Sequence, residues 1–565
     1  MIALVAVTAA GRRMADRLAS AWPDRTTVHS GPAADQLTAA WGTADAIVCF
    51  LATGAAVRLA APLLADKHTD PGVVCVDEAG RYAVALLGGH TGGANALAAE
   101  VADVLGAQPV VTTATDATGT TPLDTFGADL GFRLADRAPV ARVTAALLDG
   151  APLSLDADAT WPVPPLPTVD GVGLRLAVSD RLDATGDLVY RPPSLVVGVG
   201  ASRGVPAGDV LALIREALHT AGLAADSVCA LSTVDAKADE TGIVAAAAEL
   251  GLPLRTWPAD DLAAVEVPNP SEVVRAAVGT PSVAEAAALL GARARGRSAD
   301  LVVAKRAGAM ATVAVARLVP RGRLTIVGLG PGADELRTPR ATAALRRAGT
   351  VVGLDQYVAQ VAHLFAPGTR VLASGLGAEE ERARTAVDLA AQGHAVALIG
   401  SGDAGLYAMA SPALQLTPST VDVEVVPGVT AALAAAALLG APLGHDHAYL
   451  SLSDLHTPWP VIADRLRACA EADLVVCLYN PRSVRRTAQF DEALTILGKH
   501  RPPETPVGVV RDASRPGERT VRTTLSALAA DPSIVDMRSV VLVGSSRTIV
   551  HSGRIVTPRE YRWLS

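Results

Sequence analysis

Two glycine-rich segments in the C-terminal half of the chain have the composition of ligand-binding loops. Residues 328–332 follow an apolar run that begins at Leu324, and residues 401–405 follow the apolar run 395–399. Such short runs are typical of buried strands, and glycines after a strand let the backbone approach a ligand closely. Pro331 stiffens the first loop and removes a backbone donor, which suits a phosphate poorly. The pair therefore predicts a cleft for a nucleoside-like ligand without a phosphate tail.

The elements that must position these loops recur along the whole chain. Apolar runs at 46–51, 72–76 and 194–199 alternate with glycine loops and helical patterns, which predicts an α/β fold with largely parallel sheets. Four prolines within 162–167 interrupt the alternation, and residues 318–323 are the best linker. The predicted divisions are an α/β domain at 1–124, a middle region at 125–193, a second α/β domain at 194–317 and a C-terminal domain at 323–565.

Composition excludes several classes of protein. The formal net charge is -8 and only 3% of residues are aromatic, so we do not expect nucleic acid as the main partner. Five scattered cysteines make no C-x-x-C pair, which favours free thiols, a cytoplasmic location and no zinc site. The most apolar stretch, 430–440, is shorter than the ~20 residues of a membrane span and is predicted to be a buried helix. The apolar N-terminus lacks a preceding basic region and is predicted to be a first strand, not a signal peptide.

Five motifs in the C-terminal half occur in a fixed order. They occupy residues 328–332, 374–383, 401–407, 426–431 and 478–481. Together they resemble the tetrapyrrole methylases that use S-adenosylmethionine, and within that family most closely the precorrin-3B C17-methyltransferases, which contract the corrin ring. The resemblance runs from about residue 323 to the C-terminus. It implies two subdomains, about 323–435 and 436–565, with the cofactor cleft between them, and a homodimer formed through this domain.

A second set of motifs covers the N-terminal half. They occupy residues 53–58, 87–95, 112–116, 198–204, 232–242 and 283–287, the last with Lys305. As a set they resemble cobalt-precorrin-5A hydrolase, a family that opens a δ-lactone on a corrinoid and releases acetaldehyde. The resemblance covers about residues 1–317, although the middle region matches little. The chain thus resembles a fusion of two enzymes of cobalamin (vitamin B12) biosynthesis.

The methylase resemblance implies S-adenosylmethionine as cofactor and a set of residues that bind it. Methyl transfer from a sulfonium to carbon is an in-line displacement with an activated donor, so the protein mainly positions the reactants. Asp403 is the expected acceptor for polar groups of the cofactor, and backbone amides are expected to hold its adenine and methionine parts. The implied contacts are Pro331, Ser401, Gly402, Asp403, Leu406, Thr430, Ala431, Tyr479 and Gly508. Related sequences often carry serine where this chain has Gly400.

A corrin precursor carries many carboxylates, so cationic side chains should line its site. The candidates for substrate binding are Arg337, Arg382, Asn480 and Arg482, with Arg485 and Arg486 close behind. A solvated basic face is the alternative interpretation of each arginine. Ring contraction also needs acid/base help, for which the sequence indicates no residue.

Lactone opening requires an activated water and a stabilised oxyanion. His90 lies among glycines at 88–93 and is the predicted general base, with a structural histidine or a contact to a substrate carboxylate as alternatives. Glu240 and Lys237 form a polar cluster in an apolar neighbourhood, where acids and a lysine can shift each other's pKa values. They are the other predicted catalytic residues, and an exposed turn is the competing interpretation.

The sequence is also compatible with two other functions. The N-terminal half could be a non-catalytic module that binds corrinoids beside a working methyltransferase. A dinucleotide-dependent oxidoreductase is suggested by Gly198 and Gly200 after a strand, but the third glycine is missing and Glu216 falls within a helical pattern. The hydrolase resemblance favours a substrate that already carries cobalt, whereas the methylase motifs fit either form.

Overall fold

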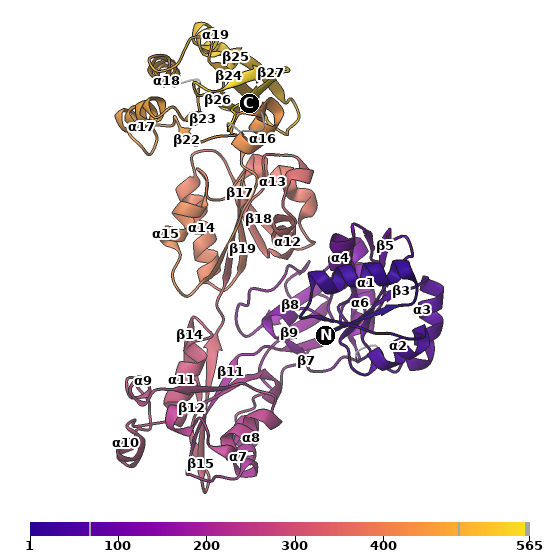
Figure 1. The fold of residues 1–565 in the computed structure, drawn as a ribbon. Coiled ribbons are helices and arrows are strands. Elements are labelled where there is room, and N and C mark those ends of the chain that lie inside the picture. Colours follow the sequence, from indigo (N-terminus) through magenta and orange to yellow (C-terminus); the bar gives the residue numbers. More distant parts are fainter. Residues whose placement is uncertain (67–68, 484–485, 560–565) are drawn as a thin grey trace. The chain divides into compact units, whose positions relative to one another are not determined.

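The computed structural model describes residues 1–66, 69–483 and 486–559, and the chain divides into two compact units. The first unit comprises residues 1–320 and 366–369, and the second comprises residues 321–365 and 370–565 (Figure 1). Both units are built from sheets covered by helices, so the predicted α/β class is confirmed. None of the described helices is long and apolar enough to cross a membrane.

The first sheet of the N-terminal unit has six strands in the order β2-β1-β3-β4-β5-β6. Its strands are β1 (Ile2–Ala6), β2 (Thr26–Val28), β3 (Ala46–Phe50), β4 (Gly72–Val76), β5 (Tyr82–Leu87) and β6 (Gln108–Val110). Its helices are α1 (Ala9–Ala21), α2 (Ala33–Trp41), α3 (Thr53–Ala60), α4 (Ala94–Leu105) and α5 (Ala114–Thr118). Strand β1 is buried along its whole length, between β2 and β3. The apolar N-terminus therefore forms the first strand, as predicted, and this strand lies inside the sheet.

The middle region is more regular than its prolines indicate. It forms a four-stranded sheet in the order β7-β10-β9-β8, with the helix α6 (Val140–Leu148). The strands are β7 (Arg133–Leu134), β8 (Leu153–Ala157), β9 (Leu174–Val178) and β10 (Leu188–Arg191). Trp161 stacks edge-on against Phe132, and Leu166 is buried in the same core. The proline-rich stretch is thus anchored at both ends by apolar side chains.

The third sheet of this unit has five strands in the order β13-β12-β11-β15-β14. The strands are β11 (Leu195–Ala201), β12 (Val228–Val234), β13 (Leu254–Trp257), β14 (Ser298–Ala307) and β15 (Ala311–Val319). The helices are α7 (Ala207–Thr220), α8 (Thr241–Glu249), α9 (Ala259–Ala263), α10 (Glu272–Val278) and α11 (Ala284–Arg293). A Cβ on Gly198 would lie 1.9 Å from the carbonyl oxygen of Ala284. This glycine therefore serves the close packing of α11 on β11, which explains it without a dinucleotide.

The second unit contains two five-stranded sheets and a small third one. The first, β18-β17-β19-β16-β20, is parallel throughout. Its strands are β16 (Arg323–Gly328), β17 (Thr350–Leu354), β18 (Arg370–Ser374), β19 (Ala395–Gly400) and β20 (Asp422–Val426), with helices α12 (Pro339–Arg347), α13 (Asp355–Val361), α14 (Glu379–Ala391) and α15 (Ala410–Leu416). Because β16 and β19 pair in register up to Gly328 and Gly400, the loops that follow them begin side by side.

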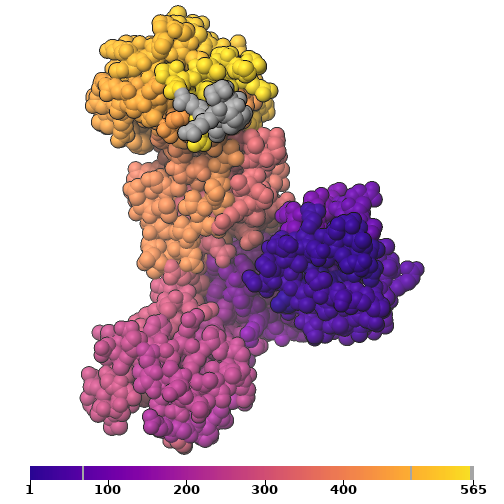
Figure 2. All heavy atoms as spheres, in the orientation of Figure 1, coloured from indigo at the N-terminus to yellow at the C-terminus, as the bar shows by residue number. Residues whose placement is uncertain are grey.

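The second sheet of this unit has the order β22-β23-β26-β24-β25. Its strands are β22 (His447–Ser451), β23 (Val475–Tyr479), β24 (Pro506–Arg511), β25 (Arg519–Thr524) and β26 (Ser539–Val543), with helices α16 (Ala431–Leu439), α17 (Trp459–Glu471), α18 (Ala488–Gly498) and α19 (Leu525–Ala530). Strands β21 (Gly440–Ala441), β27 (Ile549–His551) and β28 (Arg554–Val556) form the small sheet. Both larger sheets belong to the second compact unit, whose residues are coloured from pink through orange to yellow in the space-filling view (Figure 2). The alanine-rich stretch forms the short, largely buried helix α16, as predicted.

Candidate functional site

Three loops meet at the carboxyl ends of β16, β19 and β20. Gly330 and Gly402 exchange backbone hydrogen bonds, with N···O distances of 3.1 and 2.8 Å. A Cβ on Gly428 would lie 2.2 Å from the carbonyl oxygen of Gly402 and 2.7 Å from that of Gly328. Only glycine fits at this position, and the three loops form one tightly packed platform. The structure thus brings the two predicted ligand loops together and adds the loop after β20.

Asp403 ties two of these loops to each other. Its Oδ1 accepts a hydrogen bond from the Gly405 amide at 2.8 Å, and its Oδ2 accepts one from the Gly428 amide at 3.1 Å. The carboxylate therefore has an internal role that the sequence prediction did not include. Each carboxylate oxygen can accept a further bond, so the predicted contact to a ligand remains available.

Thr430 and Tyr479 join the platform to the second sheet of the unit. The two side-chain oxygens are 2.6 Å apart, and the Ala432 amide donates to the Tyr479 hydroxyl at 2.9 Å. The tyrosine from β23 thereby satisfies a free amide at the start of α16. Burial raises the pKa of Tyr479 to about 12, so its hydroxyl stays protonated at neutral pH. The ring of Tyr407, two residues beyond Gly405, lies 5.5 Å from that of Tyr479.

Two other predicted cofactor contacts differ in what surrounds them. A Cβ on Gly508, in β24, would lie 2.3 Å from a methyl group of Leu439 in α16. This glycine therefore permits the helix to pack against the sheet. Leu406 is half-buried in the loop after β19 and directly precedes Tyr407 in the sequence.

Arg515 reaches this platform from the turn between β24 and β25, and the sequence prediction missed it. Its Nε donates to the Pro331 carbonyl and its Nη2 donates to the Ser401 hydroxyl, both at 2.6 Å. The guanidinium also lies 5.8 Å from the ring centre of Tyr357. One side chain from the second sheet thus holds both loops of the first. The only signal in the sequence is an arginine within an Arg-Pro-Gly turn between two strands.

Two of the arginines predicted to bind substrate instead bind other groups of the protein. Arg337 is buried and pairs with Asp334 at 2.5 Å. Arg382 is buried and donates to the Gly375 carbonyl at 2.8 Å and to Glu379 at 3.1 Å. Arg337 therefore stabilises the turn that contains Asp334, and Arg382, in α14, stabilises the loop before its helix, which makes both weaker candidates for a substrate carboxylate.

Asn480 and Arg482 follow directly after β23. Asn480 has a left-handed backbone (φ 47°), and its side-chain amide donates to Ser451 at 3.1 Å. Arg482 donates through Nη1 to the Pro532 carbonyl at 3.0 Å, and its Nε is buried without a partner among the described residues. Arg486 donates to the carbonyls of Leu452 and Asn480. Arg485 lies outside the described residues.

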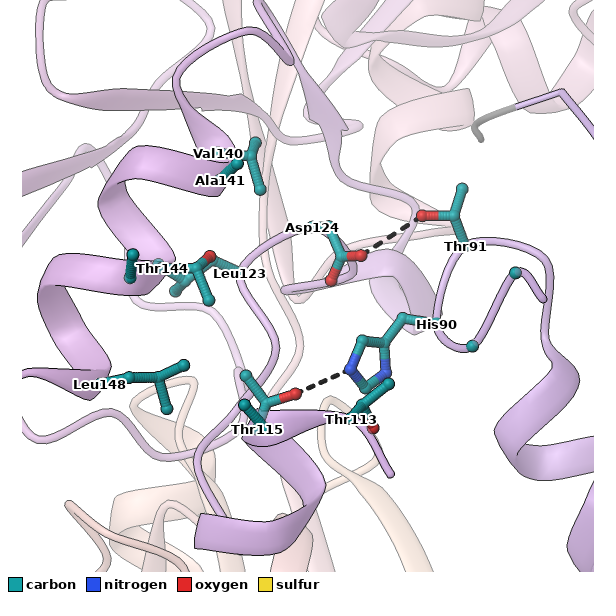
Figure 3. A pocket seen from close by; sticks show the side chains of 14 residues that line it. His90, Thr91, Thr113, Thr115, Leu123, Asp124, Val140, Ala141, Thr144 and Leu148 are labelled. Atoms are coloured by element: carbon teal, nitrogen blue, oxygen red, sulfur yellow. Dashed lines mark hydrogen bonds between the residues drawn. The ribbon is translucent and has the colours of Figure 1, made fainter. Parts of the chain in front are cut away.

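A cavity of about 440 Å³ surrounds His90 in the N-terminal unit (Figure 3). Its walls come from the loop after β5, the start of α5 and helix α6. The loop is compact, because the amides of Gly93, Ala94 and Asn95 bond to carbonyls within 88–90. Those three amides are consequently not available for an oxyanion.

The His90 ring is held by a polar network from residues 95–116. Its Nε2 lies 2.7 Å from the Thr115 hydroxyl and 3.5 Å from Oδ2 of Asp116. Asn95 donates to the same Asp116 oxygen at 2.9 Å and to Thr113. In the close-up, the imidazole points from its loop toward Thr115, across from Asp124 (Figure 3). A carboxylate beside the imidazole suits a histidine that takes up a proton.

The other two predicted catalytic residues lie elsewhere in the same unit. Lys237 donates to Glu240 Oε2 at 3.0 Å, and the Gly204 amide donates to Oε1 at 2.8 Å. These hydrogen bonds, that from Lys237 foremost, hold the pKa of the Glu240 carboxyl below its ordinary value. Lys237 lines a separate cavity of about 580 Å³. The structure therefore does not bring His90 and Lys237 into one cavity.

Three family models match the chain. The model described as "Tetrapyrrole (Corrin/Porphyrin) Methylases" matches residues 323–529. "Cobalamin synthesis G N-terminal" matches residues 35–116, and "Cobalamin synthesis G C-terminus" matches residues 195–316. The resemblances seen in the motifs of both halves are confirmed by these matches.

Three similar proteins each match less than half of this chain. A probable cobalt-factor III C(17)-methyltransferase of Salmonella typhimurium is 45% identical over 241 residues, which are 42% of this chain and 99% of the relative. A precorrin-3B C(17)-methyltransferase of a Sinorhizobium species is 39% identical over 255 residues, 43% of this chain and 99% of the relative. The crystal structure of the methyltransferase CobJ is 39% identical, covers 42% of this chain and all of its own chain, and has a TM-score of 0.40.

Proposed function

Because this chain belongs to the tetrapyrrole methylase family and carries both cobalamin synthesis G modules ahead of its methylase domain, we propose that it is a bifunctional enzyme of cobalamin biosynthesis. Its second unit would use S-adenosylmethionine to methylate C17 of precorrin-3B or its cobalt-containing counterpart, with ring contraction. Its first unit would open the lactone of a later intermediate. The observation that carries the first activity is the platform of three loops joined by Asp403 and Arg515.

The residues of the platform fit a nucleoside with a short charged tail. A Cβ on Gly400, a buried residue at the end of β19, would meet no atom within 4 Å, so space is open beside the platform. Pro331 leaves the first loop with one backbone donor fewer, which suits a ligand without a phosphate. S-adenosylmethionine, once bound, supplies an activated methyl group on a sulfonium.

The chain's own residues would orient the two reactants. Gly402 and Asp403 would hold the cofactor at the platform, and Thr430 and Ala431 would contact it from the start of α16. The Tyr479 hydroxyl fixes that start by its bonds to Thr430 and to the Ala432 amide. Because the donor is already activated, this positioning would supply most of the rate enhancement.

The first test is mass spectrometry of the corrinoid after incubation with S-adenosylmethionine. We expect a gain of one methyl group with precorrin-3B, with cobalt-precorrin-3, or with both. Asp403→Ala should lower the rate at least ~100-fold, because two hydrogen bonds to a carboxylate, each worth about 1.5–3 kcal/mol, hold the loops together. Asp388→Ala, at an exposed position in α14, is the control and should keep the activity. Failure of the wild type with both substrates would refute the methyltransferase proposal.

Lactone opening is the second proposed activity, and the His90 cavity supports it. His90 would take a proton from water as the new bond to the acyl carbon forms, and the Asp116 carboxylate would stabilise the resulting imidazolium. The acyl–oxygen bond then breaks, and the departing oxygen takes up a proton. The alternative is a module that binds corrinoids without catalysis.

A His90→Gln variant separates these alternatives. We expect it to lose lactone opening and acetaldehyde release by ~100-fold or more, since general base catalysis contributes 10²–10⁴-fold. Methyl transfer by the second unit of the same variant should be unchanged, which controls for folding and concentration. Full lactone opening by His90→Gln would exclude His90 as the base, and the absence of opening by the wild type would favour the binding module.

A further inference from the structure

The cavity of about 580 Å³ next to Lys237 belongs to neither proposed active site. It lies at the carboxyl ends of the parallel strands β11 and β12, where α/β sheets commonly bind ligands. One wall is formed by the end of the β14–β15 hairpin and another by α10 and the start of α11. From this cavity we infer a second binding site, for the carboxylate side arms of a tetrapyrrole, with Lys305 and Lys237 as its cationic residues.

Lys305 is directed by a bulge in β14. The register of the β14–β15 pair shifts between Val303 and Arg306, so that Ala304 and Lys305 oppose the single residue Ala314. Bulges of this kind redirect a side chain and are common next to binding sites. Lys305 lines the cavity, and its Nζ donates to the Asn269 carbonyl at 3.1 Å.

A fully buried carboxylate maintains this bulge. Glu285, with no exposed surface, accepts hydrogen bonds from the Lys305 amide at 2.9 Å and from the Asn269 amide and side chain at 3.1 and 2.8 Å. A buried carboxylate is costly unless it is bonded in this way. The protein therefore holds Lys305 and Asn269 in fixed positions, which a surface lysine would not require.

The charged and apolar side chains that line the cavity indicate the chemical class of its ligand. Lys237 is paired with Glu240, whereas Lys305 makes no ion pair among the described residues. Ser282 also lines the cavity, and its buried hydroxyl has no hydrogen-bond partner in the described part of the chain. The wall formed by α10 carries Val273, Val274 and Val278, and Val273 is 80% exposed. Cationic and hydroxyl groups beside an apolar wall fit a carboxylate attached to a large apolar body.

A tetrapyrrole with free acetate and propionate arms has this chemistry. This identification rests on the proposed function, because the second unit would produce such molecules. The site would hold the corrinoid by its arms while a different part of the ring reacts, or between reactions. The proposed binding site assigns a role to the motif at 283–287 and to Lys305. The lactone chemistry at His90 does not explain these residues.

The test is calorimetric titration of the full chain with cobyrinic acid, a corrin whose side-arm carboxylates are free, and with cobinamide, in which they are amides. We expect saturable binding of cobyrinic acid and at least tenfold weaker binding of cobinamide. Lys305→Met should weaken the binding of cobyrinic acid at least tenfold. Arg306→Met, at the exposed neighbouring position, is the matched control and should have no effect.

Two further measurements make the result specific to this cavity. Val273→Asp, at an exposed position that leaves the core untouched, should weaken binding by repulsion between carboxylates. Hydrogen exchange should show protection of residues 271–284 when cobyrinic acid is added. Equal binding by wild type, Lys305→Met and Val273→Asp, or protection confined to residues 88–91, would overturn the inference. Methyl transfer by the wild type is measured in parallel, so that failure of the proposed function is recognised separately.

Discussion

Replacing Arg515 by methionine should raise the KM for S-adenosylmethionine at least ~10-fold and lower kcat/KM by ~100-fold. The variant loses two hydrogen bonds from a guanidinium, to Pro331 and to Ser401, each worth about 1.5–3 kcal/mol. Both partners lie in the loops proposed to bind the cofactor. Without Arg515 these loops would no longer be held in the geometry that binds the cofactor. Arg515→Lys should recover little of the activity, because an ammonium group cannot reproduce the planar fork of donors.

Steady-state kinetics with varied cofactor and fixed corrinoid measures this effect. Arg519→Met is the control, since Arg519 is an exposed arginine in the neighbouring strand β25 and its loss removes the same charge. An Arg515→Met variant with unchanged KM for S-adenosylmethionine would show that Arg515 does not position the loops. A merely structural role would lower the melting temperature while leaving KM unchanged, so thermal unfolding is measured on the same samples.

The contrast between predicted and observed residues follows from the range of the interactions. The strand–loop pairs at 324–332 and 395–405 were predictable because their apolar runs and glycines are local signals. Arg515 was not, because its contact with Pro331 joins residues 184 positions apart. Nothing in the local sequence indicates which loop an arginine in a turn will reach.

For the buried arginines Arg337 and Arg382, the local sequence did contain a signal of their partners, but the prediction did not use it. Arg337 and Arg382 were predicted to bind substrate from their charge alone. Each has an acidic residue three positions earlier, Asp334 and Glu379, and pairs with it in the structure. Spacing of this kind favours pairing along one helical turn, so the sequence alone indicated an internal partner for each of these arginines.

The His90 site was predictable in part from local sequence and in part not. Its loop was predictable from the glycines at 88–93, and the motif at 112–116 was recognised but had no assigned role. The structure shows that Thr115 and Asp116 of this second motif hold the imidazole. Two motifs of the N-terminal half thus form one site, which could be inferred only after the strands between them had been paired.

Introducing a single methyl group at Gly428 should destabilise the second unit by about 3 kcal/mol or more, at the upper end of what overpacking costs. The new Cβ would lie 2.2 Å from one backbone carbonyl oxygen and 2.7 Å from another, those of Gly402 and Gly328. Gly328 is the last residue of the inner strand β16, and Gly402 lies in the loop directly after the inner strand β19, so neither can move without disturbing the sheet. The backbone of Gly428 does not have a positive φ, so the cost arises from lack of space alone.

Gly400→Ala is the matched control for Gly428→Ala, because it adds the same methyl group within the same platform region. A Cβ at Gly400 meets no atom within 4 Å and its backbone is extended, so we expect a change within about 0.5 kcal/mol. Calorimetric melting of the full chain should show the transition of the second unit roughly 6–12 °C lower for Gly428→Ala and unchanged for Gly400→Ala. Equal stability of the two variants would contradict the packing of the three loops. The expected difference would show that the platform tolerates added volume where the cofactor is proposed to lie and not where its own loops meet.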